Sequence, residues 1–346
     1  MKHQTTRYGE IPFYKIGTFG NTADAFISKK LFLEYKTKYS FPKKGDILIS
    51  ASGTIGRAVI YDGKPAYFQD SNIVWIDNDE TLVKNDFLFY AYSNVKWNTE
   101  HTTILRLYND NFRNTLIPLP SLNEQNAIAN ILSALDRYLY ALDALILKKE
   151  GVKKALSFEL LSQRKRLKGF NQAWQRVRLG DIANYLTSNL SAEQITQQGK
   201  IKVYDVNNFI GYTDTTFISD KPYISIVKDG SVGRVRILPP KTNILSTMGA
   251  LIANHKTTTE FLFYLLSNFD FKNFTSGSII PHIYFKDYKE KTIFLPPLNE
   301  QIAIANILSD LDNEIASLKN KKRQFENIKK ALNHDLMSAK IRVLEK

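Results

Sequence analysis

The sequence has 346 residues, of which 43% are hydrophobic and 23% charged, so it is long enough for two globular domains with ordinary cores. It contains no cysteine, which excludes disulfides and thiolate metal sites and fits a cytoplasmic protein. We find no secretory signal and no uncharged apolar run of about 18 residues, so neither export nor a membrane span is expected. Lysine and arginine outnumber aspartate and glutamate by 47 to 34, and the net charge of +13 makes nucleic acid the first candidate partner.

Two segments of the chain predict globular domains. Residues 1–121 are rich in aromatic and β-branched residues, with glycine, proline and asparagine between them, which predicts a strand-rich mixed α/β domain. Within it, Lys44–Ser50 predicts a turn that enters a strand, and Phe87–Tyr92 predicts a short buried helix. Residues 169–297 have the same character, and Phe261–Leu266 corresponds there to the buried helix.

A close internal repeat follows each domain. Leu122–Asp136 recurs as Leu298–Asp312, at an offset of 176 residues and with differences at two positions only. In both copies the apolar residues are spaced alternately three and four apart, which is typical of a coiled coil. We expect two long helices, 122–168 and 298–346, and favour their pairing with each other. The alternatives are that each helix packs on its own domain or in a homodimer.

The excess positive charge lies mainly in two runs at equivalent places in the repeat. Lys148–Lys168 and Lys319–Lys346 each carry a net charge of +6. One interpretation is that these runs are solvated helix faces, and the other is that they face a polyanion.

The two domains also resemble each other, which makes the protein a tandem repeat of α+β class. Ser52–Arg57 is similar to Asp229–Arg234, and the segment at 106–108 aligns with 282–284. Arginine can donate two hydrogen bonds to a guanine edge, and polar side chains at loop tips are suited to base contacts. The candidate DNA-binding residues are Arg57, Arg106 and Tyr108 in the first domain and Arg234, His282 and Tyr284 in the second. The alternative for each is a surface or packing role.

Catalytic motifs are not evident. The sequence has no phosphate-binding glycine loop, and its five histidines are isolated, without the spacing of metal ligands. We therefore predict no catalytic residue, no metal site and no cofactor on this chain.

The repeats carry a resemblance to a known family. Pro118–Gln125 and Leu295–Gln301, each followed by Ile-Ala-x-x-Leu-x-x-Leu-Asp, resemble the two helical repeats of type I restriction-modification specificity (S) subunits. Trp174–Ile182 resembles the segment that opens a target-recognition domain in that family, and Lys44–Arg57 resembles its Gly-Asp strand and Gly-Arg turn.

The resemblance implies a fold and a set of partners. Two target-recognition domains would be held apart by an antiparallel coiled coil with pseudo-twofold symmetry, and each would bind one half of a split site in double-stranded DNA. The chain itself would be non-catalytic. It would dock two methyltransferase subunits, which carry S-adenosylmethionine, and through them restriction and translocase subunits that use ATP and Mg²⁺. Ile131 and Ile307 flank the main seam of the helices, and we expect them to pack on the globular domains or on the methyltransferase helices.

One departure from the family pattern concerns the first domain. It has no counterpart of Trp174–Ile182, because eight residues precede Gly9. We expect this domain to be truncated or to be completed by the C-terminal end of the chain. Two competing functions remain: a coiled-coil scaffold whose domains bind proteins, and a stand-alone DNA-modifying enzyme.

Overall fold

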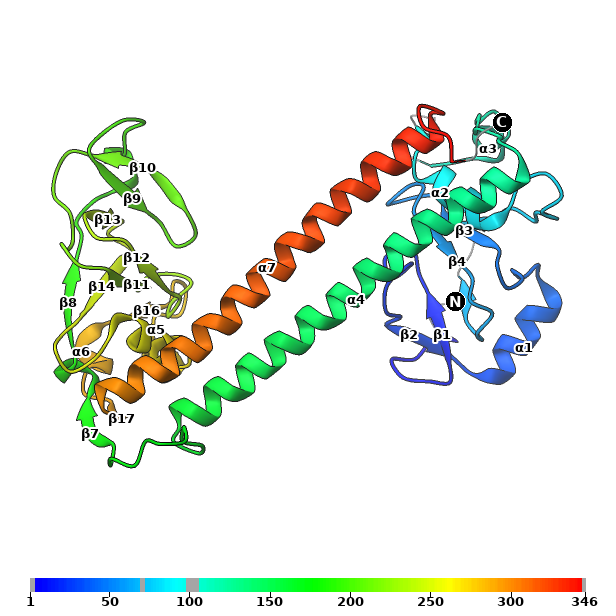
Figure 1. The fold of residues 1–346 in the computed structure, drawn as a ribbon. Helices are drawn as coiled ribbons and strands as arrows, with labels where there is room; N and C mark the ends of the chain where they lie inside the picture. The colour runs from blue at the N-terminus through cyan, green and yellow to red at the C-terminus, as the bar shows by residue number, and fades with distance from the viewer. Residues whose placement is uncertain (1–3, 69–71, 98–105, 344–346) are drawn as a thin grey trace. The chain divides into compact units, whose positions relative to one another are not determined.

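The protein consists of two compact units (Figure 1). The computed structural model describes residues 4–68, 72–97 and 106–343. Unit 1 comprises Met1–Asp143 and Asn320–Lys346, and unit 2 comprises Ala144–Lys319. Each unit therefore contains one globular domain, part of the first long helix and part of the second.

The globular part of unit 1 contains two three-stranded sheets and three short helices. The first sheet has the order β2-β1-β5 and the second the order β4-β3-β6. The strands are β1 (Ile11–Tyr14), β2 (Ala25–Ile27), β3 (Ile47–Ser50), β4 (Ala58–Ile60), β5 (Tyr67–Phe68) and β6 (Ile73–Trp75), and the helices are α1 (Lys29–Lys38), α2 (Asn85–Tyr92) and α3 (Asn109–Arg113). The strand predicted after Lys44 is β3, and the predicted buried helix is α2, so both predictions are confirmed.

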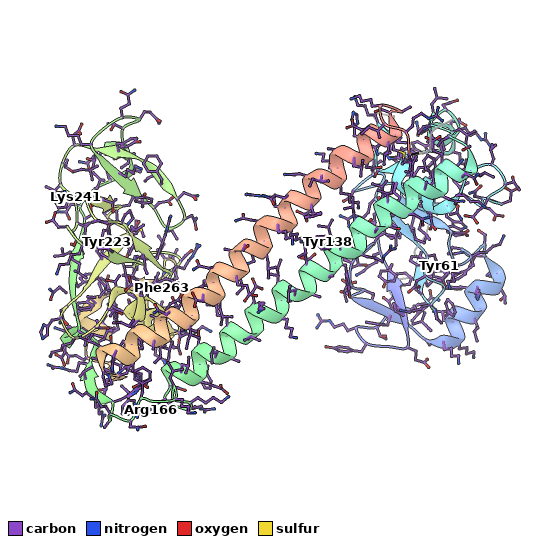
Figure 2. All side chains as sticks on the ribbon, in the orientation of Figure 1. Tyr61, Tyr138, Arg166, Tyr223, Lys241 and Phe263 are labelled. Atoms are coloured by element: carbon purple, nitrogen blue, oxygen red, sulfur yellow. The ribbon has the colours of Figure 1, made fainter. Side chains whose placement is uncertain are left out.

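Unit 2 repeats these two sheets and adds strands. Its sheets are β10-β9-β13, β12-β11-β14-β8, β17-β7 and β15-β16. The strands are β7 (Gln175–Arg178), β8 (Ala183–Thr187), β9 (Ile201–Tyr204), β10 (Phe209–Thr213), β11 (Tyr223–Val227), β12 (Val235–Leu238), β13 (Thr242–Ile244), β14 (Met248–Ala253), β15 (Thr275–Ser276), β16 (His282–Ile283) and β17 (Thr292–Leu295). The short helices are α5 (Thr259–Ser267), which contains the predicted buried segment, and α6 (Phe285–Tyr288). Figure 2 labels Tyr223, which is fully buried at the start of β11.

The two long helices are α4 (Leu122–Leu161) and α7 (Leu298–Met337), and they pack together in antiparallel fashion within each unit. In unit 1, Lys322 of α7 pairs with Asp143 of α4 at 2.7 Å. In unit 2, Lys149 of α4 pairs with Glu314 of α7 at 2.8 Å. Tyr138, labelled in Figure 2, packs against Phe325 with the two rings tilted by 55° and their centroids 4.7 Å apart. The predicted α+β fold with a paired antiparallel coiled coil is confirmed.

Each long helix also packs on the globular domain of the unit in which it begins. Leu132 is fully buried in a cluster with Phe87 and Tyr90 of α2. Leu308 is fully buried in a cluster with Phe261 of α5. The seam residues near each helix start therefore contact a domain as well as the other helix, so the two packing alternatives are combined.

The helix ends differ from the prediction. The first helix ends at Leu161 rather than at Lys168, because Gln163 adopts a left-handed backbone with φ 63° and the Lys165 N–H bonds back to the Glu159 carbonyl. The second ends at Met337 in the same way, with Ala339 at φ 56°. Residues 163 and 339 are separated by the repeat offset of 176, so the stop signal is part of the repeat.

Much of the basic charge on the long helices is paired across them. Cross-helix ion pairs join lysines of one helix to acids of the other: Lys149–Glu314, Lys153–Asp312, Lys319–Glu150, Lys322–Asp143 and Lys329–Asp136. The two positively charged runs thus contribute to helix pairing, which is a different role from either interpretation of the sequence.

Two of these pairs belong to triads that link a domain to both helices. In unit 1, the Tyr90 hydroxyl of α2 donates to Asp136 of α4 at 2.8 Å, and Lys329 of α7 pairs with the same carboxylate. In unit 2, Tyr264 and Asp312 make the matching bond at 2.9 Å. Burial, together with the hydrogen bond to the carboxylate, raises the pKa of Tyr90 well above its usual value, so the phenol remains a donor.

A buried glutamate at the start of each long helix binds an arginine beyond the end of the other. Glu300 accepts two hydrogen bonds from Arg166 and one from the Trp174 indole at 3.0 Å. Glu124 accepts two from Arg342. The neighbouring glutamine is fully buried in both copies, and Gln301 donates to the carbonyls of Lys256 and Pro296. The Glu-Gln pair of the repeat therefore joins helix start to domain.

We expect the Glu300→Ala variant to be strongly destabilised. The Glu300 side chain is 1% exposed, and its removal leaves the Trp174 N–H without its acceptor and Arg166 without its carboxylate partner, with the Gln172 carbonyl still accepting from Arg166. Breaking such a buried pair costs roughly 3 kcal/mol. Urea titration should show this loss of unfolding free energy, whereas Glu290→Ala, which removes an exposed partner of Arg178, should have little effect. Equal effects of the two substitutions would contradict the structural role of Glu300.

Candidate nucleic-acid interface

Each domain presents a glycine loop at the end of a central strand. In unit 1, the loop Gly53–Gly56 is closed by two backbone bonds, from the Gly56 N–H to the Ser50 carbonyl and from the Ser50 N–H to the Arg57 carbonyl. In unit 2, Gly233 and Arg234 make the same two bonds with Val227. The similarity that the sequence suggested is thus a shared loop geometry.

Both backbone conformation and steric crowding require glycine at the second glycine position of each loop. Gly56 has φ 79° and Gly233 φ 82°, in the left-handed region that favours glycine. A Cβ atom at Gly56 would lie 2.2 Å from Trp97 Nε1, and one at Gly233 would lie 2.7 Å from the Phe271 ring. An aromatic side chain therefore supports each loop from behind.

In unit 1, the structure brings the loop and the other two predicted residues together. Ser52, at the start of the loop, forms a β-bridge with Arg106. The Arg106 guanidinium lies over the Tyr108 ring, 5.8 Å from its centroid, and Tyr108 is 40% exposed. The exposed Arg57 donates to the Phe19 carbonyl at 2.9 Å, which fixes the direction of its side chain. The unit 1 cluster is Arg57, Arg106 and Tyr108.

Unit 2 has the same arrangement with different chemistry. Asp229 occupies the position of Ser52 and forms the β-bridge with His282. The ring of His282 lies parallel to that of Tyr284, with centroids 6.5 Å apart, and Tyr284 is 48% exposed. Arg234 is exposed and donates to the Asn207 side chain at 2.7 Å. The unit 2 cluster is Arg234, His282 and Tyr284.

The two clusters differ most in their charge. Asp229 accepts hydrogen bonds from His282 Nδ1 at 2.6 Å and from Lys228 at 2.8 Å. Burial alone would raise the pKa of Asp229, but these two hydrogen bonds outweigh it and hold the pKa below its usual value. The carboxylate is therefore ionised at neutral pH, whereas Ser52 in unit 1 carries no charge. Surfaces of different polarity suit different base sequences.

The predicted partner-binding residues are partly exposed. Ile131 is 37% exposed and Ile307 is half-buried, and neither belongs to an apolar cluster within the described residues. The seam positions beside them, Leu132 and Leu308, are fully buried against the domains, and the packing of Ile131 and Ile307 on the domains or on methyltransferase helices stays a prediction. Leu122 and Leu298, another repeated pair, are 38% and 45% exposed. Both units thus expose apolar residues at equivalent points of the repeat.

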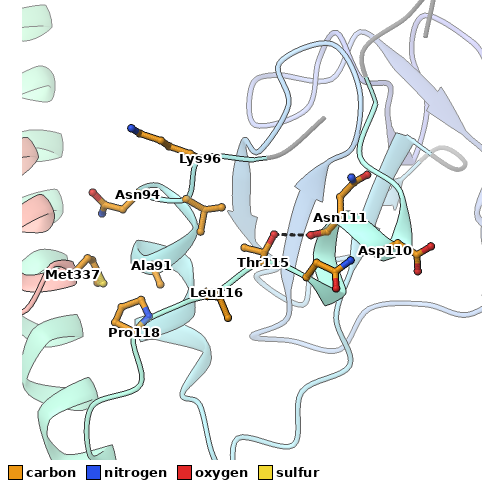
Figure 3. Close-up of a pocket in the computed structure, with 11 residues that line it drawn as sticks. Ala91, Asn94, Lys96, Asp110, Asn111, Thr115, Leu116, Pro118 and Met337 are labelled. Carbon is orange, nitrogen blue, oxygen red and sulfur yellow. Dashed lines mark hydrogen bonds between the residues drawn. The ribbon is translucent and has the colours of Figure 1, made fainter. Parts of the chain in front are cut away.

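A cleft of about 650 Å³ in unit 1 lies beside the segment 114–118 (Figure 3). It is lined by Asn94 and Lys96 on one side and by Thr115 and Leu116 on another, and the Thr115 hydroxyl donates to the Asn111 carbonyl at 2.6 Å. Within the described ranges, no group of three or more histidine, aspartate or glutamate side chains could hold a metal ion. In the same part of the chain, no helix has the length and apolarity needed to cross a bilayer.

Sequence reasoning missed the residues that hold each domain on the helices. These are the pairs Gln125 and Gln301, Glu124 and Glu300, and Asp136 and Asp312, together with Tyr90 and Tyr264. The signal was available, because polar residues repeated without change on an otherwise apolar helix face indicate a buried contact.

Comparison with known proteins places these features in a family. The type I restriction modification DNA specificity domain matches residues 1–149 and 171–327, one match to each half of the chain. A putative type I restriction enzyme specificity subunit of Haemophilus influenzae is 64% identical over 133 residues, which cover 38% of this chain and 34% of that relative. The chain thus spans about a third of that protein. The putative MjaX specificity subunit of Methanocaldococcus jannaschii is 28% identical over 335 residues, covering 86% of this chain and 79% of the relative.

Solved structures show the same fold. The crystal structure of the type I restriction-modification system S subunit from M. genitalium has a TM-score of 0.64 at 21% identity, covering 97% of this chain and 91% of that one. A chain from a study of complex assembly and conformational transition of the type I R-M system has a TM-score of 0.52 at 15% identity, covering 85% and 82%. With both halves matched, the chain belongs to the type I restriction-modification specificity subunits, the family defined by this DNA specificity domain.

Proposed function

We propose that this chain recognises a bipartite DNA site for a type I restriction-modification complex and performs no chemistry itself. Each domain would bind one half-site, with the unit 1 cluster at the first and the unit 2 cluster at the second. The observation that carries the proposal is the repeated glycine loop, which presents exposed Arg57 and Arg234 in the same backbone frame beside neighbours of different charge. Two loops with the same backbone geometry but different neighbouring side chains suit two domains that recognise different DNA sequences.

The proposed partners are supported by the family match and by the repeated exposed apolar residues. Methyltransferase subunits would dock at Ile131 and Ile307 and bring S-adenosylmethionine, and restriction subunits with ATP and Mg²⁺ would join through them. The net charge of +13 supports a polyanionic ligand, although the cross-helix ion pairs use part of the lysine excess. We propose a cytoplasmic location, where such complexes meet DNA.

Substitution of the unit 1 cluster should affect one half-site only. We expect Arg57→Ala with Arg106→Ala to weaken discrimination at the first half-site, because each arginine-to-base contact is worth about 1–3 kcal/mol. The matching pair, Arg234→Ala with His282→Ala, should relax the second half-site instead. Lys64→Ala, at an exposed lysine of unit 1, should leave both sequences unchanged.

The measurement is methylation mapping in cells that express each variant with the methyltransferase subunits, combined with gel shifts on the mapped site. An unchanged first half-site and unchanged affinity after both unit 1 substitutions would reject these contacts. Methyl transfer by the isolated chain would favour a stand-alone enzyme. Failure to bind duplex DNA, with or without methyltransferase subunits, would favour a protein scaffold.

A further inference from the structure

The turn between β9 and β10 in unit 2 contacts two arginines that follow the glycine loop. Arg234 Nη2 donates to the Asn207 Oδ1 atom at 2.7 Å, and Arg236 Nη1 donates to the Asn207 backbone carbonyl at 2.9 Å. Arg236 lies on β12, which Figure 1 labels together with both strands of the hairpin. Asn207 is therefore held by its side chain and by its backbone, although it is exposed.

The backbone of this turn is fixed by further hydrogen bonds. The Asp205 carboxylate accepts from the Asn207 N–H at 2.8 Å and from the Asn208 N–H at 2.7 Å. The Arg236 guanidinium lies over the Tyr204 ring, 5.3 Å from its centroid, which holds the arginine against the hairpin. Because the turn is already ordered, its side chains would lose little conformational entropy on binding a ligand.

Arg234 determines which end of the Asn207 amide remains available. A guanidinium can only donate hydrogen bonds, so the amide atom that faces it must be the oxygen. Within residues 4–68, 72–97 and 106–343, the structure gives no hydrogen bond from Asn207 Nδ2 or from the other N–H groups of Arg234. The exposed pair therefore presents N–H donors to a ligand.

This pair differs from the equivalent place in unit 1. Arg57 donates to the backbone carbonyl of Phe19 instead of to a side chain. The residue two positions beyond it is Val59, whereas the residue two positions beyond Arg234 is Arg236. A base preference that depends on Asn207 should therefore be confined to the second half-site.

The donors of the pair favour one kind of base edge. In the major groove guanine presents two acceptors, N7 and O6, whereas adenine and cytosine each present an amino group, which is a donor. The usual contact of asparagine with adenine needs Oδ1 as the acceptor from the adenine amino group, and here Arg234 already donates to that oxygen. Guanine therefore fits the pair best.

We propose that Asn207 is a specificity-determining residue of unit 2, and that the Arg234–Asn207 pair recognises guanine in the second half-site. Arg234 would donate to O6 and N7 of the guanine, and the Asn207 amino group would donate to an acceptor of the adjacent base pair. Arg236 is a positioning residue, because it holds the Asn207 backbone and does not itself contact the base. This inference rests on the proposed function and adds a residue outside the glycine loop.

The test uses the full chain assembled with its methyltransferase subunits. Methylation mapping gives the wild-type site, and competition gel shifts then compare duplexes in which each base pair of the second half-site is replaced in turn. We expect Asn207→Ala to reduce discrimination at the guanine and at the adjacent base pair by about tenfold. Asn207→Asp keeps an acceptor for Arg234 but lacks the amino group, so it should lose the preference at the adjacent base pair.

Asn208→Ala is the matched control. Asn208 is exposed in the same turn, and its described hydrogen bonds use only its backbone, so this variant should keep the wild-type preferences. Arg236→Ala should lower the same discrimination as Asn207→Ala. Arg236→Lys retains a donor and a cation beside Tyr204 and should restore part of it. The first half-site should be unchanged in every variant.

Three results would overturn the inference alone: a second half-site without guanine, wild-type preferences in Asn207→Ala, or an equal loss of affinity for every duplex. The last result would indicate a phosphate contact or a purely structural role. In each of these cases the wild-type complex still recognises two half-sites, so the proposed function stands. A wild-type complex that binds all duplexes equally would overturn both.

Discussion

Lengthening both long helices by 22 residues is expected to lengthen the unread spacer of the DNA site by about ten base pairs. The insertions go between Asp143 and Ala144 in α4 and between Lys319 and Asn320 in α7. These points are equivalent in the repeat and lie at the boundary between the units. Two 11-residue repeats preserve the apolar seam and add about 33 Å to each helix. One turn of DNA is about 34–36 Å, so the added length matches about one turn of the duplex.

An insertion of 11 residues at both points is the control for the rotational position of the domains around the DNA. It adds about 16 Å, or half a turn of DNA, which would turn one domain away from its groove. We expect this variant to lose joint recognition while each domain keeps its binding chemistry. Methylation mapping of both variants decides the matter. An unchanged spacer in the 22-residue variant would mean that the helices do not set the distance between half-sites.

The Ile131→Glu, Ile307→Glu double variant is expected to lose assembly with the methyltransferase subunits. A carboxylate buried without a partner in a protein interface costs about 3 kcal/mol, which corresponds to roughly a hundredfold in affinity at each site. Folding should be nearly unchanged, because Ile131 is 37% exposed and neither residue lies in an apolar cluster of the described chain. Size-exclusion chromatography with purified methyltransferase subunits measures the loss.

Leu147→Glu is the matched control for this variant. Leu147 is also an exposed apolar residue of α4, at 68%, but its counterpart in the second copy is Arg323. A surface used by two equivalent partners should be apolar in both copies, so this position should tolerate the charge. Normal assembly of the double isoleucine variant would place the docking surface elsewhere.

The sequence was most informative about features that are repeated or strictly periodic. The alternate spacing of apolar residues predicts α4 and α7, and the duplication predicts two domains of one design. The helix ends could not be predicted, because Gln163 and Ala339 are residues that rarely adopt a left-handed backbone. Gly169 was a more natural stop by propensity, but the hydrogen bond from Lys165 to the Glu159 carbonyl closes the helix earlier.

The candidate interface was predicted in part. The aligned loops identified Arg57 and Arg234, and the structure adds that Ser52 and Asp229 tie each loop to the next predicted residue. Asp229 and His282 are 53 residues apart in the chain, so no local sequence pattern predicts their hydrogen bond. The ion pairs between the helices were missed for the same reason, since a run of lysines does not show which carboxylates on the other helix oppose it.

The central claim is that each domain reads one half-site independently, and one exchange tests it directly. Residues 1–121 are replaced by the first domain of another specificity subunit, with both long helices and residues 169–297 left unchanged. The variant is expressed with its methyltransferase subunits, and all methylated sites in the host genome are mapped. The account predicts a new first half-site, an unchanged second half-site and an unchanged spacer. A change in both half-sites, or methylation at the original site, would contradict it.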